Sequence, residues 1–301
     1  MTAIPFVHLD DPRYGEAWPV SPMIRRVVAN NPSKYTYHGT GTYIVGHGVV
    51  AVIDPGPDNL AHRDALQRAL VGEQVTAIVV THCHADHSPL AAWLREITGA
   101  PTIAVGPHGE VGPVDDDVKI EESIDLEFAP DLVVADGDRV AGAGWTLRAV
   151  HTPGHTSNHL CLALEEESAL FTGDHIMGWS TTVVSPPDGD MAAYIDSLRK
   201  VAGRRERVLW PTHGAPVLEP ETFVQAYLDH RLQREAEVLA AVRAGTVGID
   251  EIVRRLYAGL REELHKPAGR SVLAHLVKLR NDGLVATDVA APWLDSEFHP
   301  V

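Results

Sequence analysis

The sequence has very little cysteine and no long apolar run. Its 301 residues include two cysteines, Cys83 and Cys161, which are too few for a disulfide framework and are typical of a reducing compartment. No stretch approaches the roughly 20 apolar residues that span a bilayer. The first ten residues also lack the basic start and long apolar stretch of a secretory signal. We therefore expect a cytoplasmic protein that does not enter a membrane.

Basic residues are scarce as well. Lysine and arginine together number 25 against 41 aspartate and glutamate residues, which gives a net charge of −16. Such a surface repels polyanions in bulk, so nucleic-acid binding would need a local basic patch. With 45% hydrophobic residues, the chain can bury a sizeable core. We expect a large domain over residues 1–218 and a small one over residues 219–301.

One short segment concentrates side chains that are costly to bury without partners. Residues 81–87 read Thr-His-Cys-His-Ala-Asp-His and follow an apolar run at residues 75–80. Each buried imidazole or carboxylate needs a polar partner, and a shared cation would supply one. The possible ligands are His82, His84, His87 and Asp86. This donor mix suits zinc, iron or manganese. Side chains alternate along an extended segment, so Cys83 is expected to point away from the cation.

Further polar segments follow other short apolar strands. They contain Asp54, His155, Asp174 and His213. In α/β proteins, sites usually lie at the carboxyl ends of strands. Pro153 and Gly154 fix a sharp turn that presents His155 rigidly. Asp54 precedes a Gly/Pro turn, where it either accepts backbone hydrogen bonds or orients a ligand histidine. His159 begins the next strand and faces either the core or the site.

The remaining residues of the first 218 alternate between strand and helix patterns. Strands are predicted at residues 40–54, 75–80 and 102–105, and helices at residues 58–71 and 89–97. This alternation predicts an α/β fold. Residues 106–131 interrupt it with a run of acids, which indicates a solvated loop.

These motifs together resemble the metallo-β-lactamase superfamily. The resemblance rests on Asp54 in IDPGP, THCHADH at residues 81–87, PGH ending at His155, GD ending at Asp174 and THG containing His213. It implies an αββα sandwich, in which two sheets pack face to face with helices outside. It also implies two divalent ions, most commonly Zn²⁺, with Mn²⁺ or Fe²⁺ as alternatives. By motif matching, one ion binds His82, His84 and His155, the other binds Asp86, His87 and His213, and Asp174 bridges them.

The chemistry that the resemblance implies is hydrolysis. A metal-bound hydroxide would attack a carbonyl carbon or a phosphorus atom. Asp86 and Asp54 are the carboxylates with expected catalytic roles. Asp86 would orient the nucleophile as well as bind metal, and Asp54 would hold a ligand histidine in place.

The last eighty or so residues show the pattern of a winged helix. Helices are predicted at residues 220–244, 249–256 and 268–280, followed by a strand at residues 284–286. With residues 178–183, this pattern looks like the β-lactamase-like endoribonuclease family, which implies a single-stranded RNA substrate. The candidate substrate-binding residues are His159, Thr181, Thr182, Arg270 and Lys278. A solvated face around packed leucines explains the basic residues of the last helix equally well.

The core motifs also fit other activities. A thioester hydrolase of the glyoxalase II kind shares them, as do a mononuclear-iron persulfide dioxygenase and a β-lactamase. The substrate would then be a small-molecule ester or thioester in place of RNA. A non-enzymatic winged-helix protein with a structural metal would have a closed site of four ligands, and the seven ligands argue against it. The sequence leaves the substrate open, and also whether the chain pairs with a second copy as a homodimer.

Overall fold

The structure is a computed structural model that describes residues 3–109, 124–259, 261 and 264–301. The acidic run at residues 115–122, predicted to be a solvated loop, lies outside the described residues.

The first half of the chain forms a seven-stranded sheet in which spatial order follows chain order. Its strands are β1 (Trp18–Pro19), β2 (Ile24–Val28), β3 (Gly41–His47), β4 (Val49–Ile53), β5 (Gln74–Val79), β6 (Thr102–Ala104) and β7 (Leu132–Val133). Strands β1 to β4 pair antiparallel, and β4 to β7 pair parallel. Gly48 turns the chain between β3 and β4 with φ 72°, a conformation that favours glycine. This turn confirms the hairpin within the strand pattern at residues 40–54.

A five-stranded sheet follows, in the order β12-β11-β10-β9-β8. Its strands are β8 (Arg139–Gly142), β9 (Trp145–His151), β10 (Leu160–Leu164), β11 (Ala169–Gly173) and β12 (Val208–Pro211). All neighbours pair antiparallel except β11 and β12, which run parallel.

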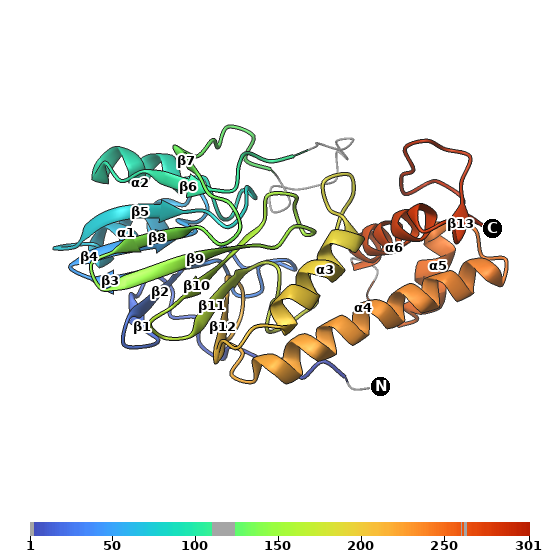
Figure 1. The fold of residues 1–301 in the computed structure, drawn as a ribbon, viewed down its shortest axis with the longest axis horizontal. Helices are drawn as coiled ribbons and strands as arrows, with labels where there is room; N and C mark the ends of the chain where they lie inside the picture. Colours follow the sequence, from blue (N-terminus) through green and yellow to red (C-terminus); the bar gives the residue numbers. More distant parts are fainter. Residues whose placement is uncertain (1–2, 110–123, 260, 262–263) are drawn as a thin grey trace.

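The two sheets pack face to face over a shared apolar core (Figure 1). Tyr43 and Ile53 from one sheet meet Leu147 and Phe171 from the other, all at most 1% exposed. Helices α1 (Leu60–Ala69) and α2 (Leu90–Thr98) cover the outer face of the first sheet, and α3 (Met191–Ala202) and α4 (Pro220–Arg243) cover that of the second. The predicted αββα sandwich is therefore confirmed.

Local sequence explains where these helices begin. The Asn59 side chain accepts hydrogen bonds from Ala61 N and His62 N at the start of α1, and the Asp190 side chain accepts one from Ala193 N of α3. Helix α2 differs from the prediction. It begins at Leu90, and Ser88 donates its hydroxyl to Asp125 Oδ2 at 2.7 Å in place of capping the helix.

The C-terminal elements build a second core. Helices α5 (Ile249–Leu256) and α6 (His265–Asn281) and the hairpin of β13 (Val285–Ala286) and β14 (His299–Pro300) pack on the last turns of α4. Helix α4 is shared, because Phe223 and Tyr227 belong to the core beside the second sheet while Val238 and Val242 belong to the C-terminal core. Figure 1 shows α4 running from the sandwich to the C-terminal helices. Within the described residues, no helix is both long enough and apolar enough to cross a membrane.

Trp145 gives a test of the packing between the sheets. Its ring is 1% exposed, Nε1 donates to Val49 O at 2.9 Å, and a Cβ at Gly46 or Gly142 would lie within 2.5 Å of the ring. We expect Trp145→Ala to lower the free energy of unfolding by about 3–5 kcal/mol, because the cavity fills only partly. Urea unfolding measures this change. Trp18→Ala, at a side chain 44% exposed, is the control and should cost about 1 kcal/mol or less. Equal losses would contradict the account.

Candidate metal centre

The polar segments that follow the strands converge on one point of the sandwich. The segments after β5, β9, β11 and β12 bring seven ligand-type side chains together, and the segment after β4 adds Asp54. These are His82, His84, Asp86, His87, His155, Asp174 and His213. Gly154 holds the turn before His155 at φ 136°, and a Cβ there would lie 2.3 Å from Tyr194 Cα on α3. This contact is the reason for the glycine in the Pro-Gly-His turn.

A first group consists of three imidazoles. His84 Nδ1 lies 3.0 Å from His82 Nε2 and 3.2 Å from His155 Nε2. Zinc–nitrogen bonds of tetrahedral geometry separate ligand atoms by about 3.3 Å, so the spacing fits a shared cation. Burial lowers the pKa of His82 well below its ordinary value and that of His84 to about 3. The rings therefore stay neutral and keep a lone pair for a metal.

A second group consists of Asp86, His87 and His213. Asp86 Oδ2 lies 3.3 Å from His87 Nε2 and 3.2 Å from His213 Nε2. Burial alone would lower the pKa of both imidazoles, but the facing carboxylates outweigh it. The pKa of His87 is raised well above its ordinary value, and that of His213 is raised to about 9.

Asp174 lies between the two groups. Its Oδ1 is 3.6 Å from His87 Nε2 and 3.4 Å from His213 Nε2, and its Oδ2 is 3.9 Å from His155 Nε2. Asp174 Oδ1 and His87 Nε2 are buried without a hydrogen bond to any described residue. Buried polar atoms are rarely left in this state, and a cation between them would satisfy both. The donor set therefore fits a metal.

Asp54 fixes the orientation of ligand histidines. His87 Nδ1 donates to Asp54 Oδ2 at 2.9 Å, which leaves Nε2 for a metal. Thr81 donates to the same oxygen through Oγ1 at 2.8 Å and accepts from His82 Nδ1 at 3.1 Å. Thr212 Oγ1 adds a donor at 3.1 Å. Asp54 Oδ1 also accepts from Thr81 N at 2.8 Å, so Asp54 does both things expected of it: it accepts a backbone hydrogen bond and it orients a candidate ligand histidine. Asp54 holds a φ of 48°, an uncommon conformation for an aspartate.

Backbone carbonyls orient other ligands. His155 Nδ1 donates to Val183 O at 2.6 Å, and His213 Nδ1 donates to Gly39 O at 3.2 Å. Both contacts leave Nε2 facing the centre. Thr40 Oγ1 donates to Asp86 Oδ2 at 2.9 Å. The sequence did not single out Thr40, because a threonine before a strand carries no signal of its own.

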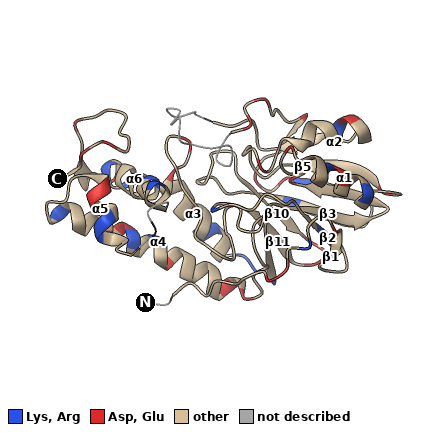
Figure 2. Ribbon diagram, turned by 180° about the vertical axis from the view of Figure 1, so that it is seen from behind, with Lys and Arg blue, Asp and Glu red and all other residues tan. Residues whose placement is uncertain are grey.

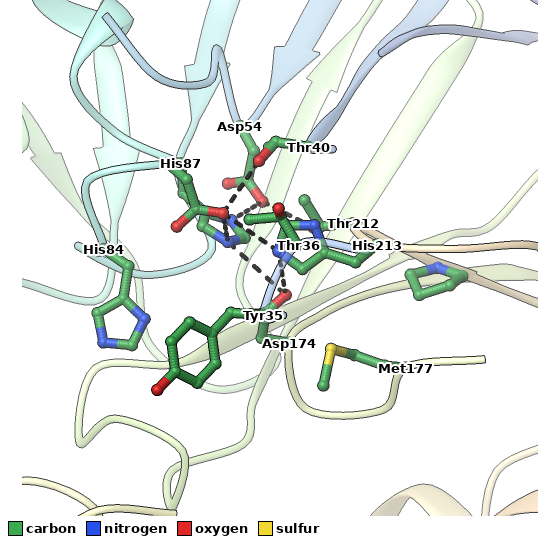
Figure 3. A network of polar contacts seen from close by, with 12 residues as sticks. Tyr35, Thr36, Thr40, Asp54, His84, His87, Asp174, Met177, Thr212 and His213 are labelled. Carbon is green, nitrogen blue, oxygen red and sulfur yellow. Dashed lines mark hydrogen bonds and ion pairs between the residues drawn. The ribbon is translucent and has the colours of Figure 1, made fainter. Parts of the chain in front are cut away.

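Figure 3 shows the centre from close by, with Asp54, Thr40 and Thr212 around His87 and His213. Tyr35 and Met177 lie on the side of Asp174 away from Asp54.

Cys83 points away from the ligands, as predicted. It is 1% exposed, and its sulfur accepts a hydrogen bond from Asn158 Nδ2 at 3.0 Å. Burial raises the pKa of the Cys83 thiol to about 11, so it stays protonated near neutral pH.

Two predicted substrate-binding residues lie inside the protein and support the centre. His159 is fully buried, and its Nε2 accepts from Asp174 N at 3.1 Å. Thr182 is 1% exposed, and its hydroxyl donates to Asp174 O at 2.7 Å. The backbone N–H and C=O of Asp174 use these two side chains, and contact of either with a substrate stays a prediction. Thr181 is half-buried and stays a prediction.

The structure does not present the basic residues of the last helix as one exposed patch. Arg270 is 7% exposed and His275 is fully buried, so neither can serve as part of an exposed surface. Lys278 Nζ lies 2.9 Å from Glu235 Oε1 and 2.7 Å from Asp282 Oδ2. Figure 2 shows basic and acidic segments interspersed along α4 and α5. Lys266 is exposed, and Arg280 Nη1 donates to Ala290 O at 3.1 Å, so the basic residues of α6 lie in different surroundings.

The fold and the centre together define a class. The chain belongs to the metallo-beta-lactamase superfamily, whose family profile matches residues 37–213. A profile for the beta-lactamase associated winged helix domain matches residues 248–293, which confirms the predicted winged helix.

Curated relatives span nearly the whole chain. The chain is 30% identical over 286 residues to the atrochrysone carboxyl ACP thioesterase of Aspergillus chevalieri, covering 90% of this chain and 85% of the relative. It is 30% identical over 272 residues to the beta-lactamase-like protein 2 homolog of Caenorhabditis elegans, covering 88% and 87%. The superfamily and the thioesterase relatives indicate a hydrolase.

Solved structures agree on the fold. A beta-lactamase domain protein from Burkholderia ambifaria superposes with a TM-score of 0.77 at 22% identity, covering 97% of this chain and 95% of that one. A metallo-beta-lactamase family protein from Thermus thermophilus gives a TM-score of 0.74 at 23% identity, covering 94% and 100%.

The two groups should respond differently to pH. Ligand nitrogens must lose their protons to bind metal, and the pKa of His213 is raised to about 9. Between about pH 7 and pH 9, each drop of one pH unit should lower the affinity for the ion at His213 by about tenfold per displaced proton. The ion at His82 and His84 should bind with little pH dependence, because those imidazoles are already neutral. Zn²⁺ competition with a chromophoric chelator measures both affinities. An identical pH dependence of the two affinities would contradict the prediction.

Asp54→Asn tests the support of the ligand histidines. An amide cannot match a carboxylate as acceptor for His87 Nδ1 and two threonine hydroxyls. We expect Zn²⁺ affinity to fall by about 10-fold to 100-fold while the fold remains. Asp136→Asn, at an exposed carboxylate, is the control. Affinity unchanged by Asp54→Asn would exclude the role given to Asp54.

Proposed function

We propose that this chain is a metal-dependent hydrolase that holds two divalent ions and cleaves an acyl thioester. The observation that carries the proposal is the pair of ligand groups joined by Asp174, with its buried Oδ1 atom without a hydrogen bond. Nitrogen and oxygen donors of this kind suit Zn²⁺, with Mn²⁺ or Fe²⁺ as alternatives. Bound divalent ions supply a nucleophile near neutral pH by lowering the pKa of bound water, and they polarise the scissile carbonyl.

The residues of the chain have separate parts in this chemistry. Asp86 is held by the Thr40 hydroxyl, so its carboxylate keeps one orientation beside His87 and His213. That orientation suits a carboxylate that both binds metal and directs a water molecule toward the substrate. Asp54 acts through His87 and is a positioning residue.

The thioester is favoured over RNA by two observations. Curated relatives that match 90% of the chain are named as ACP thioesterases, including the one from Aspergillus chevalieri. Of the two α6 residues predicted to bind RNA, Arg270 is buried and Lys278 pairs with Glu235 and Asp282, so the contacts predicted for RNA gain no support. The net charge of −16 adds general repulsion of a polyanion.

The location in the cell is proposed to be the cytoplasm. The two cysteines are free and buried, which fits a reducing compartment.

Substrate panels with metal removal test the proposal. We expect the protein to hydrolyse an acyl-pantetheine thioester faster than single-stranded RNA, bis-nitrophenyl phosphate or nitrocefin. A chelator should abolish the activity, and Zn²⁺ should restore it, because the nucleophile depends on the metal. Asp86→Ala and His87→Ala should lower thioester turnover by about 100-fold or more. S-lactoylglutathione in the same panel distinguishes a glyoxalase II-like substrate.

Two results would count against this function. Thioester cleavage that survives the chelator would reject the metal chemistry. Cleavage of RNA in preference to every thioester would reject the substrate class while leaving the metal centre in place.

A further inference from the structure

An irregular segment between β11 and α3 supports two ligands of the metal centre. We call residues 176–184 the support loop. It contains neither helix nor strand, yet Ile176 and Val184 are fully buried. Val183 O accepts the hydrogen bond from His155 Nδ1 at 2.6 Å, and Thr182 Oγ1 donates to Asp174 O at 2.7 Å. The position of this loop therefore affects both His155 and Asp174.

Helix α4 holds the support loop from the other side. Arg231 Nη2 donates to Thr182 O, and the Tyr227 hydroxyl donates to Ser180 O. The same hydroxyl accepts a hydrogen bond from Met177 N at 3.3 Å. Two successive carbonyls of the loop thus accept hydrogen bonds from different sides. Thr182 O accepts from Arg231 of α4, and Val183 O accepts from His155.

A buried arginine is suited to hold the loop in one position. Arg231 is 2% exposed, and its guanidinium lies over the Tyr194 ring of α3 at 5.1 Å. A buried charge is costly unless its partners are fixed, so the contacts of Arg231 favour one arrangement of α3, α4 and the loop. Removing the guanidinium would leave Thr182 O without its donor.

We infer that Arg231 is a positioning residue of the metal centre, through which helix α4 holds the support loop against His155. The far end of α4 packs in the C-terminal core through Val238 and Val242. The winged-helix region is thereby joined to the ligand set by one continuous helix. The inference rests on the metal-binding part of the proposed function and is independent of the substrate.

The same helix provides a matched control. Arg234 lies three residues further along α4, and its guanidinium also stacks on a tyrosine, Tyr257, at 4.3 Å. Its polar contacts are with Glu237 at 2.8 Å and Leu256 O at 3.4 Å. These partners belong to α4 and α5 and do not touch the support loop.

The experiment compares Arg231→Met with Arg234→Met in the full chain. Zn²⁺ affinity is measured by competition with a chromophoric chelator, and Co²⁺ absorption in the visible range reports the coordination of the ion. We expect Arg231→Met to weaken binding of the ion at His82, His84 and His155 by about tenfold or more and to change the Co²⁺ spectrum. Arg234→Met should stay within about twofold of the unmodified protein, even if it lowers thermal stability.

Different results overturn different claims. Failure of the unmodified protein to bind Zn²⁺ would refute the metal centre itself. Folded Arg231→Met with unchanged affinity would refute only the inference, as would equal weakening by Arg234→Met. If Arg231→Met does not fold, Tyr227→Phe decides, because it removes the α4 hydroxyl that donates to Ser180 O of the support loop. Weaker Zn²⁺ binding by that variant supports the inference, and unchanged binding rejects it.

Discussion

The rest of the centre depends on the hydrogen bonds that the Asp54 carboxylate accepts. His87 donates to it directly, and Thr81 links it to His82, so one carboxylate sets which ring nitrogen faces the metal in both ligand groups. Thr212 brings in the end of a strand from the second sheet. The positive φ of Asp54 places it at this junction. The two sheets are thereby tied together at the point where the chemistry occurs.

The candidate ligands could be picked out from the sequence because their signal is chemical. Histidines and carboxylates recur directly after apolar strands, and strand ends meet at an edge of a sheet. The groups that orient them were harder to predict. Thr40 is an ordinary threonine, and Val183 acts through its backbone carbonyl, which no side chain announces. His159 was identified as a site residue, but its exact partner, the N–H of Asp174, required the structure.

The C-terminal region shows the opposite outcome. Its helices were predicted closely, since their apolar positions recur at helical intervals, but the role of its basic residues was not. Arg270 and Lys278 form a basic pattern along α6, yet tertiary packing buries one and pairs the other with carboxylates. Charge pattern alone does not say which face of a helix is covered. In the same way, only the structure shows that α4 belongs to both cores and that Arg231 reaches the support loop.

The central claim is that seven side chains, from the segments that follow β5, β9, β11 and β12, hold two divalent ions. Crystals of the Zn²⁺-loaded protein, measured on both sides of the zinc absorption edge, test it most directly. The account predicts two anomalous peaks, one among His82, His84 and His155 and the other among Asp86, His87 and His213, with Asp174 between them. No peak at these side chains in protein exposed to excess Zn²⁺, or peaks only at other residues, would contradict it.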